Sequence, residues 1–230
     1  MFIKDFLFPK FCLDCKKPGG YICLKCQKKL LYIKKEKCFY CQKPSLYNLT
    51  HQNCLKKFYI DQVGSVFYYN DFLKKIIKNI KYRFVKEALD ELLKLINPLN
   101  IRFLELYKKI SDNIFIQPIP LHKNKLKERG FNQAYFIALY LNKLFNFPII
   151  DFLERVKETK NQAEIKEKKQ RYLNIKGAFR IKKDINEKDL KNKRIILVDD
   201  VITTGHTANE ASKVLKKSGV LKVYCFTLAQ

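Results

Sequence analysis

The sequence has no long hydrophobic run. No apolar stretch approaches the roughly 18 residues that a helix needs to cross a membrane. The N-terminus, residues 1–11, is apolar, but Lys4 and Asp5 interrupt it and it leads directly into cysteines. It therefore does not have the form of a signal peptide. We expect a protein without a membrane span, located in the cytoplasm.

Acidic residues are scarce. The 230 residues include 47 Lys and Arg but only 22 Asp and Glu, which gives a formal net charge of +25. An excess of this size favours a polyanionic partner such as a nucleic acid. The alternative is a solvated basic surface that keeps the protein soluble and has no partner.

The chain also lacks the two commonest phosphate-binding loops, Gly-x4-Gly-Lys-Ser/Thr and Gly-x-Gly-x-x-Gly. A different arrangement stands at residues 194–207, where an apolar run of strand length is followed by Asp199, Asp200, a polar turn with Gly205 and a helical pattern. Backbone N–H groups of residues 204–207, at the helix start, suit a phosphate. Ionised carboxylates only accept hydrogen bonds, so the acidic pair suits ribose hydroxyls. The stretch predicts a ribose 5-phosphate site; the alternative is an ordinary strand before a capped helix.

Seven of the eight cysteines lie within residues 12–54, mostly in pairs separated by two residues. A C-x2-C turn directs both sulfurs at one tetrahedral ion, so the spacing predicts two structural zinc ions. Disulfides fit poorly, because seven is an odd number and cytosolic thiols stay reduced. We expect pairing in sequence order, four ligands per ion, with cross-braced pairing as the alternative. The predicted ligands are Cys12, Cys15, Cys23, Cys26, Cys38, Cys41, His51 and Cys54.

The rest of the chain predicts an α/β fold. Strands alternate with helices after residue 110, which favours a parallel sheet with helices on both faces and a ligand at the carboxyl ends of the strands. We expect strands or short strands at residues 58–69, 114–121, 177–181 and 221–229, and helices at residues 70–81, 85–96 and 131–144. The first of these helices carries a lysine face that we interpret as solvated surface, formed by Lys74, Lys75, Lys78 and Lys81.

Two motifs carry a resemblance to known families. Residues 195–207 resemble the phosphoribosyl pyrophosphate (PRPP) loop of the type I phosphoribosyltransferases, with its apolar strand, acidic pair and Thr-Gly-x-Thr. Pro-x-Pro-Leu at 118–121, the basic segment after it and Arg-Gly-Phe-Asn-Gln at 129–133 resemble the signature of the ComF family, the competence-associated branch of phosphoribosyltransferase-like proteins. Members of that family also carry an N-terminal cysteine module, so the resemblance covers nearly the whole chain.

The resemblance implies a type I phosphoribosyltransferase-like domain at residues 58–230, preceded by a zinc-binding double ribbon at residues 1–57. It implies a PRPP site that works with Mg²⁺, in which Asp199 and Asp200 form the catalytic pair. Residues 155–162 resemble the family's mobile loop. The predicted PRPP contacts are Asp199, Asp200, Thr203, Thr204, Gly205, His206, Thr207, Lys125 and Arg129. For Lys125 and Arg129, the alternative is that they belong to a basic surface turn.

No residue offers itself as the recogniser of a purine or pyrimidine, so turnover of PRPP does not follow from the loop. We favour a ComF-like factor of natural transformation that binds PRPP and single-stranded DNA. For the basic residues within 155–194, a groove that follows a nucleic-acid backbone, with Tyr172 and Phe179 as stacking groups, is an equal alternative to the mobile loop. The alternatives are a phosphoribosyltransferase with an unidentified acceptor and a PRPP-sensing regulator. In the regulator, the zinc module would contact another competence or DNA-processing protein.

Overall fold

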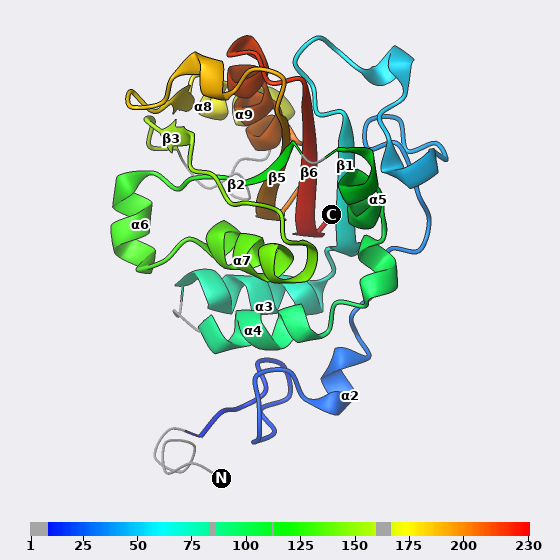
Figure 1. Ribbon diagram of the computed structural model, residues 1–230. Coiled ribbons are helices and arrows are strands. Elements are labelled where there is room, and N and C mark those ends of the chain that lie inside the picture. The colour runs from blue at the N-terminus through cyan, green and yellow to red at the C-terminus, as the bar shows by residue number, and fades with distance from the viewer. Residues whose placement is uncertain (1–8, 83–85, 112, 160–166) are drawn as a thin grey trace.

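The computed structural model describes residues 9–82, 86–111, 113–159 and 167–230 (Figure 1). Its centre is a parallel sheet of four strands in the order β1-β6-β5-β2. The predicted α/β fold with a parallel sheet is therefore confirmed. The strands are β1 (Gln62–Phe67), β2 (Ile114–Pro118), β5 (Arg194–Val201) and β6 (Lys222–Ala229).

Strand β5 is buried on both faces of the sheet. Ile196 and Val198 belong to one apolar cluster, whereas Ile195 and Leu197 belong to the cluster on the opposite face. A strand that is buried on both sides has a continuous apolar run in its sequence. This is why β5 could be predicted.

Helices cover both faces of the sheet (Figure 1). One apolar cluster packs under α3 (Asp71–Tyr82), α4 (Lys86–Lys94), α5 (Phe103–Ile110) and α7 (Gln133–Phe145). The other packs under α8 (Lys168–Ile175), α9 (His206–Lys217) and the antiparallel pair β3 (Leu153–Arg155) and β4 (Phe179–Ile181). The 3₁₀ helices are η1 (Leu46–Asn48), η2 (Gln52–Cys54), η3 (Pro98–Ile101) and η4 (Glu187–Asp189).

One further helix, α6 (Lys123–Arg129), replaces the basic loop that we expected after β2. His122 caps its start, since its Nδ1 accepts from the backbone N–H of Asn124 at 3.4 Å. Gly130 ends it in the left-handed conformation, at φ 69°. A capped single helix of seven residues is too short for its periodicity to show in the sequence.

The cysteine-rich segment packs against this framework. Its first part, with α2 (Leu24–Gln27), lies beside α3 and α4 in Figure 1. Asp14 pairs there with Lys75 of α3 at 2.7 Å, and Glu91 of α4 accepts from the backbone N–H of Ile22 at 2.8 Å. Among the described residues, no helix is both long and apolar enough to cross a membrane.

Candidate functional site

A cavity of about 430 Å³ lies at the carboxyl ends of β5 and β6. The loop after β5 and the first residues of α9 form one wall, α3 a second, and α6 with the start of α7 a third. Every residue that we predicted to contact PRPP lines this single cavity: Asp199, Asp200, Thr203, Thr204, Gly205, His206, Thr207, Lys125 and Arg129.

The acidic pair lies at the end of β5. Asp200 is 8% exposed, and its carboxylate pairs with Nζ of Lys81 at 2.7 Å. Asp199 accepts from the backbone N–H of Asp200 at 2.9 Å. Withdrawal from water and, after it, the charge of Asp200 raise the pKa of Asp199 to about 7. A pKa near 7 puts Asp199 close to its midpoint of ionisation at neutral pH.

Lys81 departs from the solvated lysine face that we expected on α3, whereas Lys74, Lys75 and Lys78 are exposed as expected. Lys74, Lys78 and Lys81 all line the cavity, at helical spacing along one side of α3. Burial alone would lower the pKa of Lys81, but the carboxylates of Asp200 and Asp199 outweigh burial and the net shift is upward. The pair of Lys81 and Asp200 could not be predicted from the sequence, because more than a hundred residues separate its members.

Helix α6 directs two cations into the cavity. Lys125 and Arg129 are four residues apart and so share one face of the helix. Arg129 is 6% exposed, and within the described ranges its Nε has no hydrogen-bond partner. Lys125 donates to the carbonyl of Thr159 at 2.7 Å. Burial, followed by repulsion from Arg155 and Arg129, lowers the pKa of Lys125.

Gln133, Arg155 and Arg171 are among the further lining residues that were not predicted as ligand contacts. Gln133 is 3% exposed, and its Nε2, like Nε of Arg155, is a buried donor with no partner in the part of the chain that the structure describes. Buried donors of this kind cost free energy unless a ligand or water satisfies them. Gln133 ends the Arg-Gly-Phe-Asn-Gln motif and Arg155 begins the predicted mobile loop, so both stood in segments that the sequence had already singled out.

The turn between β5 and α9 presents a helix N-terminus to the cavity. Gly205 has φ 73°, a left-handed conformation that non-glycine residues rarely adopt. It is the N-cap of α9, a helix of 12 residues whose N-terminus carries partial positive charge. Residues 203–208 all line the cavity, so that charge faces the space between the acidic pair and α6.

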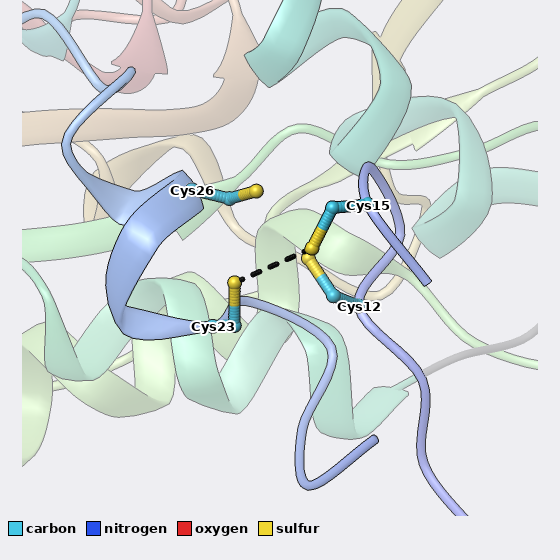
Figure 2. A group of neighbouring side chains, drawn as sticks. All are labelled: Cys12, Cys15, Cys23 and Cys26. Atoms are coloured by element: carbon cyan, nitrogen blue, oxygen red, sulfur yellow. Dashed lines mark hydrogen bonds between the residues drawn. The ribbon is translucent and has the colours of Figure 1, made fainter. Parts of the chain in front are cut away.

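Seven of the cysteines and His51 form two groups of four, each with its ligand atoms within 4.8 Å of one another. Figure 2 shows the first group, Cys12, Cys15, Cys23 and Cys26, with the sulfurs converging on one point. The second group is Cys38, Cys41, His51 and Cys54. The grouping follows sequence order, as expected, and not the cross-braced alternative. Each group could hold a tetrahedral zinc ion.

His51 is oriented as a ligand. Its Nδ1 lies 3.3 Å from Sγ of Cys41, whereas Nε2 lies 3.1 Å from the carbonyl of Pro44. A hydrogen bond from Nε2–H to that carbonyl leaves the lone pair of Nδ1 for a metal, which is the arrangement of metal-bound histidines.

The predictions for the basic residues at 155–194 have different outcomes. Phe179 is 4% exposed in the core beneath β4, so its proposed role as a stacking group was wrong. Tyr172 is exposed, and its ring lies 6.0 Å from that of His206. The predicted mobile loop, residues 155–162, lies outside the described residues from residue 160 onward.

Comparison with known proteins gives two kinds of match. Residues 127–230 match the family model described as a phosphoribosyl transferase domain. Competence protein F of Haemophilus influenzae is 30% identical over 212 residues, covering 91% of this chain and 90% of that protein. Competence protein ComFC of Bacillus subtilis is 29% identical over 222 residues, covering 92% and 85%. DNA utilization protein YhgH of Escherichia coli K12 is 28% identical over 116 residues, half of this chain.

Proposed function

The chain belongs to the ComF family of competence proteins, and from this premise we propose that it binds PRPP in the cavity and handles single-stranded DNA during DNA uptake. One observation carries the PRPP assignment. An acidic pair, a helix N-terminus and buried guanidinium and amide nitrogens that have no hydrogen-bond partner among the described residues converge on one cavity of about 430 Å³. PRPP offers a hydroxyl pair, a monophosphate and a pyrophosphate, the groups that these three features complement.

Each group of PRPP has a matching wall. The 5-phosphate binds the backbone of residues 203–207 at the start of α9. The ribose hydroxyls donate to Asp199 and Asp200. The pyrophosphate faces the donors of α6, α7 and β3, where Arg129 offers a charged fork. Mg²⁺ prefers oxygen ligands, and it would accompany PRPP through the pyrophosphate and hydroxyl oxygens beside the acidic pair.

The DNA assignment rests on the charge at the mouth of the cavity. Lys74 and Lys78 line the cavity yet are exposed, and among the described residues neither has a carboxylate partner. This differs from Lys75 and Lys81 on the same helix, which pair with Asp14 and Asp200. Lysines without partners attract a phosphate backbone irrespective of sequence. We therefore place the single strand along α3 in preference to residues 155–194.

The proposal is tested by following a fluorescently labelled single-stranded oligonucleotide by anisotropy across a salt series, with and without Mg²⁺ and PRPP. We expect the logarithm of the affinity to fall with the logarithm of salt at about −0.7 per phosphate contacted. Any effect of PRPP on DNA affinity must appear reciprocally as an effect of DNA on PRPP affinity. Binding that does not respond to salt, or no binding at all, would contradict the DNA assignment.

A second candidate function, phosphoribosyl transfer, is favoured by the match of residues 127–230 to a phosphoribosyl transferase domain. Incubation with Mg²⁺, PRPP and candidate acceptors should then release pyrophosphate in wild-type protein and not in an Asp199→Asn/Asp200→Asn variant. Absence of release with all acceptors, in protein that binds PRPP, would favour binding without turnover.

A further inference from the structure

The segment between two ligand positions of the second cysteine group contacts the turn at residues 203–207, which we call the phosphate turn. Phe39 lies between the ligand positions Cys38 and Cys41, and it belongs to the apolar cluster that includes Ile202 and Ala208 on either side of the turn. A Cβ atom added to Gly205 would stand 2.8 Å from Cε1 of Phe39, closer than real Cβ contacts come. The ring is 9% exposed and therefore forms a wall behind the turn.

Tyr40, the next residue, holds the first turn of α9 by a hydrogen bond. Its hydroxyl donates to Oδ1 of Asn209 at 2.7 Å. Oδ1 of Asn209 also accepts from the backbone N–H of Ile60 at 3.2 Å. The backbone N–H of Asn209 donates to the carbonyl of Gly205 at 2.8 Å. The ring of Tyr40 stacks on Tyr59 at 4.9 Å, so its hydroxyl has little freedom to move.

The segment between Cys38 and Cys41 is a tight turn that begins and ends at two predicted ligands. Backbone N–H groups of Gln42 and Cys38 close a tight turn, at 2.8 and 2.9 Å from the carbonyls of Cys38 and Lys43. Gln42 has φ 61°, an unfavourable value for a non-glycine residue. A tetrahedral ion bound by Cys38, Cys41, His51 and Cys54 would hold this turn in that conformation.

We propose that the Cys38–Cys41 turn positions the phosphate turn through Phe39 and Tyr40, so that loss of metal from the second group weakens phosphate binding at residues 203–207. The identity of the ligand rests on the proposed function, whereas the mechanical coupling does not. The first group supplies a natural control, because its segment docks on α3 and α4 through Asp14 and Ile22.

The test compares full-length variants that empty one group each. Cys38→Ser/Cys41→Ser removes ligands of the second group, and Cys15→Ser/Cys23→Ser removes the same number from the first. Native mass spectrometry measures the metal content, and calorimetry with Mg²⁺ measures the PRPP affinity. Hydrogen exchange measures the protection of the backbone amides at residues 203–209. We expect one zinc ion in each variant. Only the second-group variant should show faster exchange at residues 203–209 and at least tenfold weaker PRPP binding.

A single substitution that leaves every zinc ligand in place distinguishes loss of the contact from misfolding. Tyr40→Phe removes one hydroxyl and keeps the ring, so it should retain two zinc ions and an unchanged circular dichroism spectrum while PRPP affinity falls about three- to tenfold, the value of roughly one hydrogen bond. Tyr47→Phe, on an exposed residue of the same segment that does not line the cavity, is the matched control and should leave PRPP affinity unchanged.

Hydrogen exchange separates the two proposals. If the wild-type protein binds no PRPP but exchange at residues 203–209 still rises in the second-group variant alone, the proposed function fails and the positioning role stands. If exchange is unchanged in that variant, or rises equally in both double variants, the positioning role is overturned whatever the ligand.

Discussion

Two carboxylates at the end of β5 are held in a site that also contains a lysine. Asp200 is almost fully enclosed and is neutralised by Lys81 at 2.7 Å, while Asp199 carries a pKa raised to about 7. Such a shift means that ionising Asp199 costs free energy in this environment, and a ligand that supplies hydroxyl donors or a cation would lower that cost. The acids could be predicted as a pair from their place after an apolar run. Lys81 could not, because helical periodicity separates the faces of a helix without saying what each face meets.

The raised pKa of Asp199 makes stability depend on pH. The unfolded carboxyl loses its proton near its ordinary value of 3.8, whereas the folded one keeps it up to about 7, so the folded state binds more protons between these values. The contribution of Asp199 to the unfolding free energy should therefore fall as pH rises through this window. Asp199→Asn should gain stability over wild type, by up to about 1 kcal/mol per pH unit between pH 5 and 7.

Urea unfolding of the two proteins across pH 5 to 8 measures that difference. Asp184→Asn, which alters an exposed carboxyl after β4, is the control and should run parallel to wild type. A difference between Asp199→Asn and wild type that does not change with pH would show that Asp199 titrates normally in the folded protein.

Lys81 and Lys75 offer a comparison on one helix. Lys81→Met leaves the enclosed Asp200 without its partner, and we expect a loss of about 1–3 kcal/mol, less than for a fully buried pair because Lys81 is 24% exposed. Lys75→Met removes a lysine that is 57% exposed, and Asp14 keeps Lys29, so the loss should be under about 1 kcal/mol. Equal losses in chemical unfolding would contradict the account of the Lys81–Asp200 pair.

At the scale of elements, α3 and α6 supply much of the charge around the cavity. Both present basic residues at helical spacing, Lys74 and Lys78 on α3, Lys125 and Arg129 on α6. The α6 residues were predicted because they sit in a motif, although the segment was expected to be a loop. The α3 residues were assigned to solvent, since an amphipathic pattern is the same whether the polar face meets water or a ligand.

The lysines of α3 should determine DNA binding. Lys74→Ala/Lys78→Ala removes two phosphate contacts, so single-strand affinity should fall and the magnitude of the salt slope should decrease by about 1.4. Lys108→Ala/Lys109→Ala changes the net charge equally on exposed positions of α5, outside the cavity, and is the matched control. An identical loss in both variants would mean that net charge, and not α3, governs binding.

At the scale of the molecule, two groups of four potential metal ligands pack against the framework around the sheet, and residues of the cysteine-rich segment join both apolar clusters. The cysteine spacing was sufficient to predict both groups and their order, because ligand geometry is local. The contacts of these groups with α3, α4 and α9 could not be predicted from the sequence, because they join segments far apart in the chain. Buried donors such as Gln133 were hidden for the same reason: burial is a property of the fold.

Zinc should hold the N-terminal segment together. We expect two zinc ions per chain, and their removal by a strong chelator should make residues 10–57 sensitive to trypsin, since the segment has little apolar core of its own. Strands β5 and β6, in the shared core, should remain protected. Mass spectrometry of the fragments, before and after zinc is restored, measures this. An unchanged fragment pattern in protein shown to be free of zinc would contradict a structural role for the metal.

The central claim is that the cavity at the end of β5 is a PRPP site, and calorimetric titration of the full-length protein with PRPP and Mg²⁺ tests it most directly. We predict saturable heat with one site per chain in wild type, and none in an Asp199→Asn/Asp200→Asn variant that keeps the wild-type circular dichroism spectrum. Absence of heat in the wild-type protein, or undiminished binding in the variant, would contradict the claim.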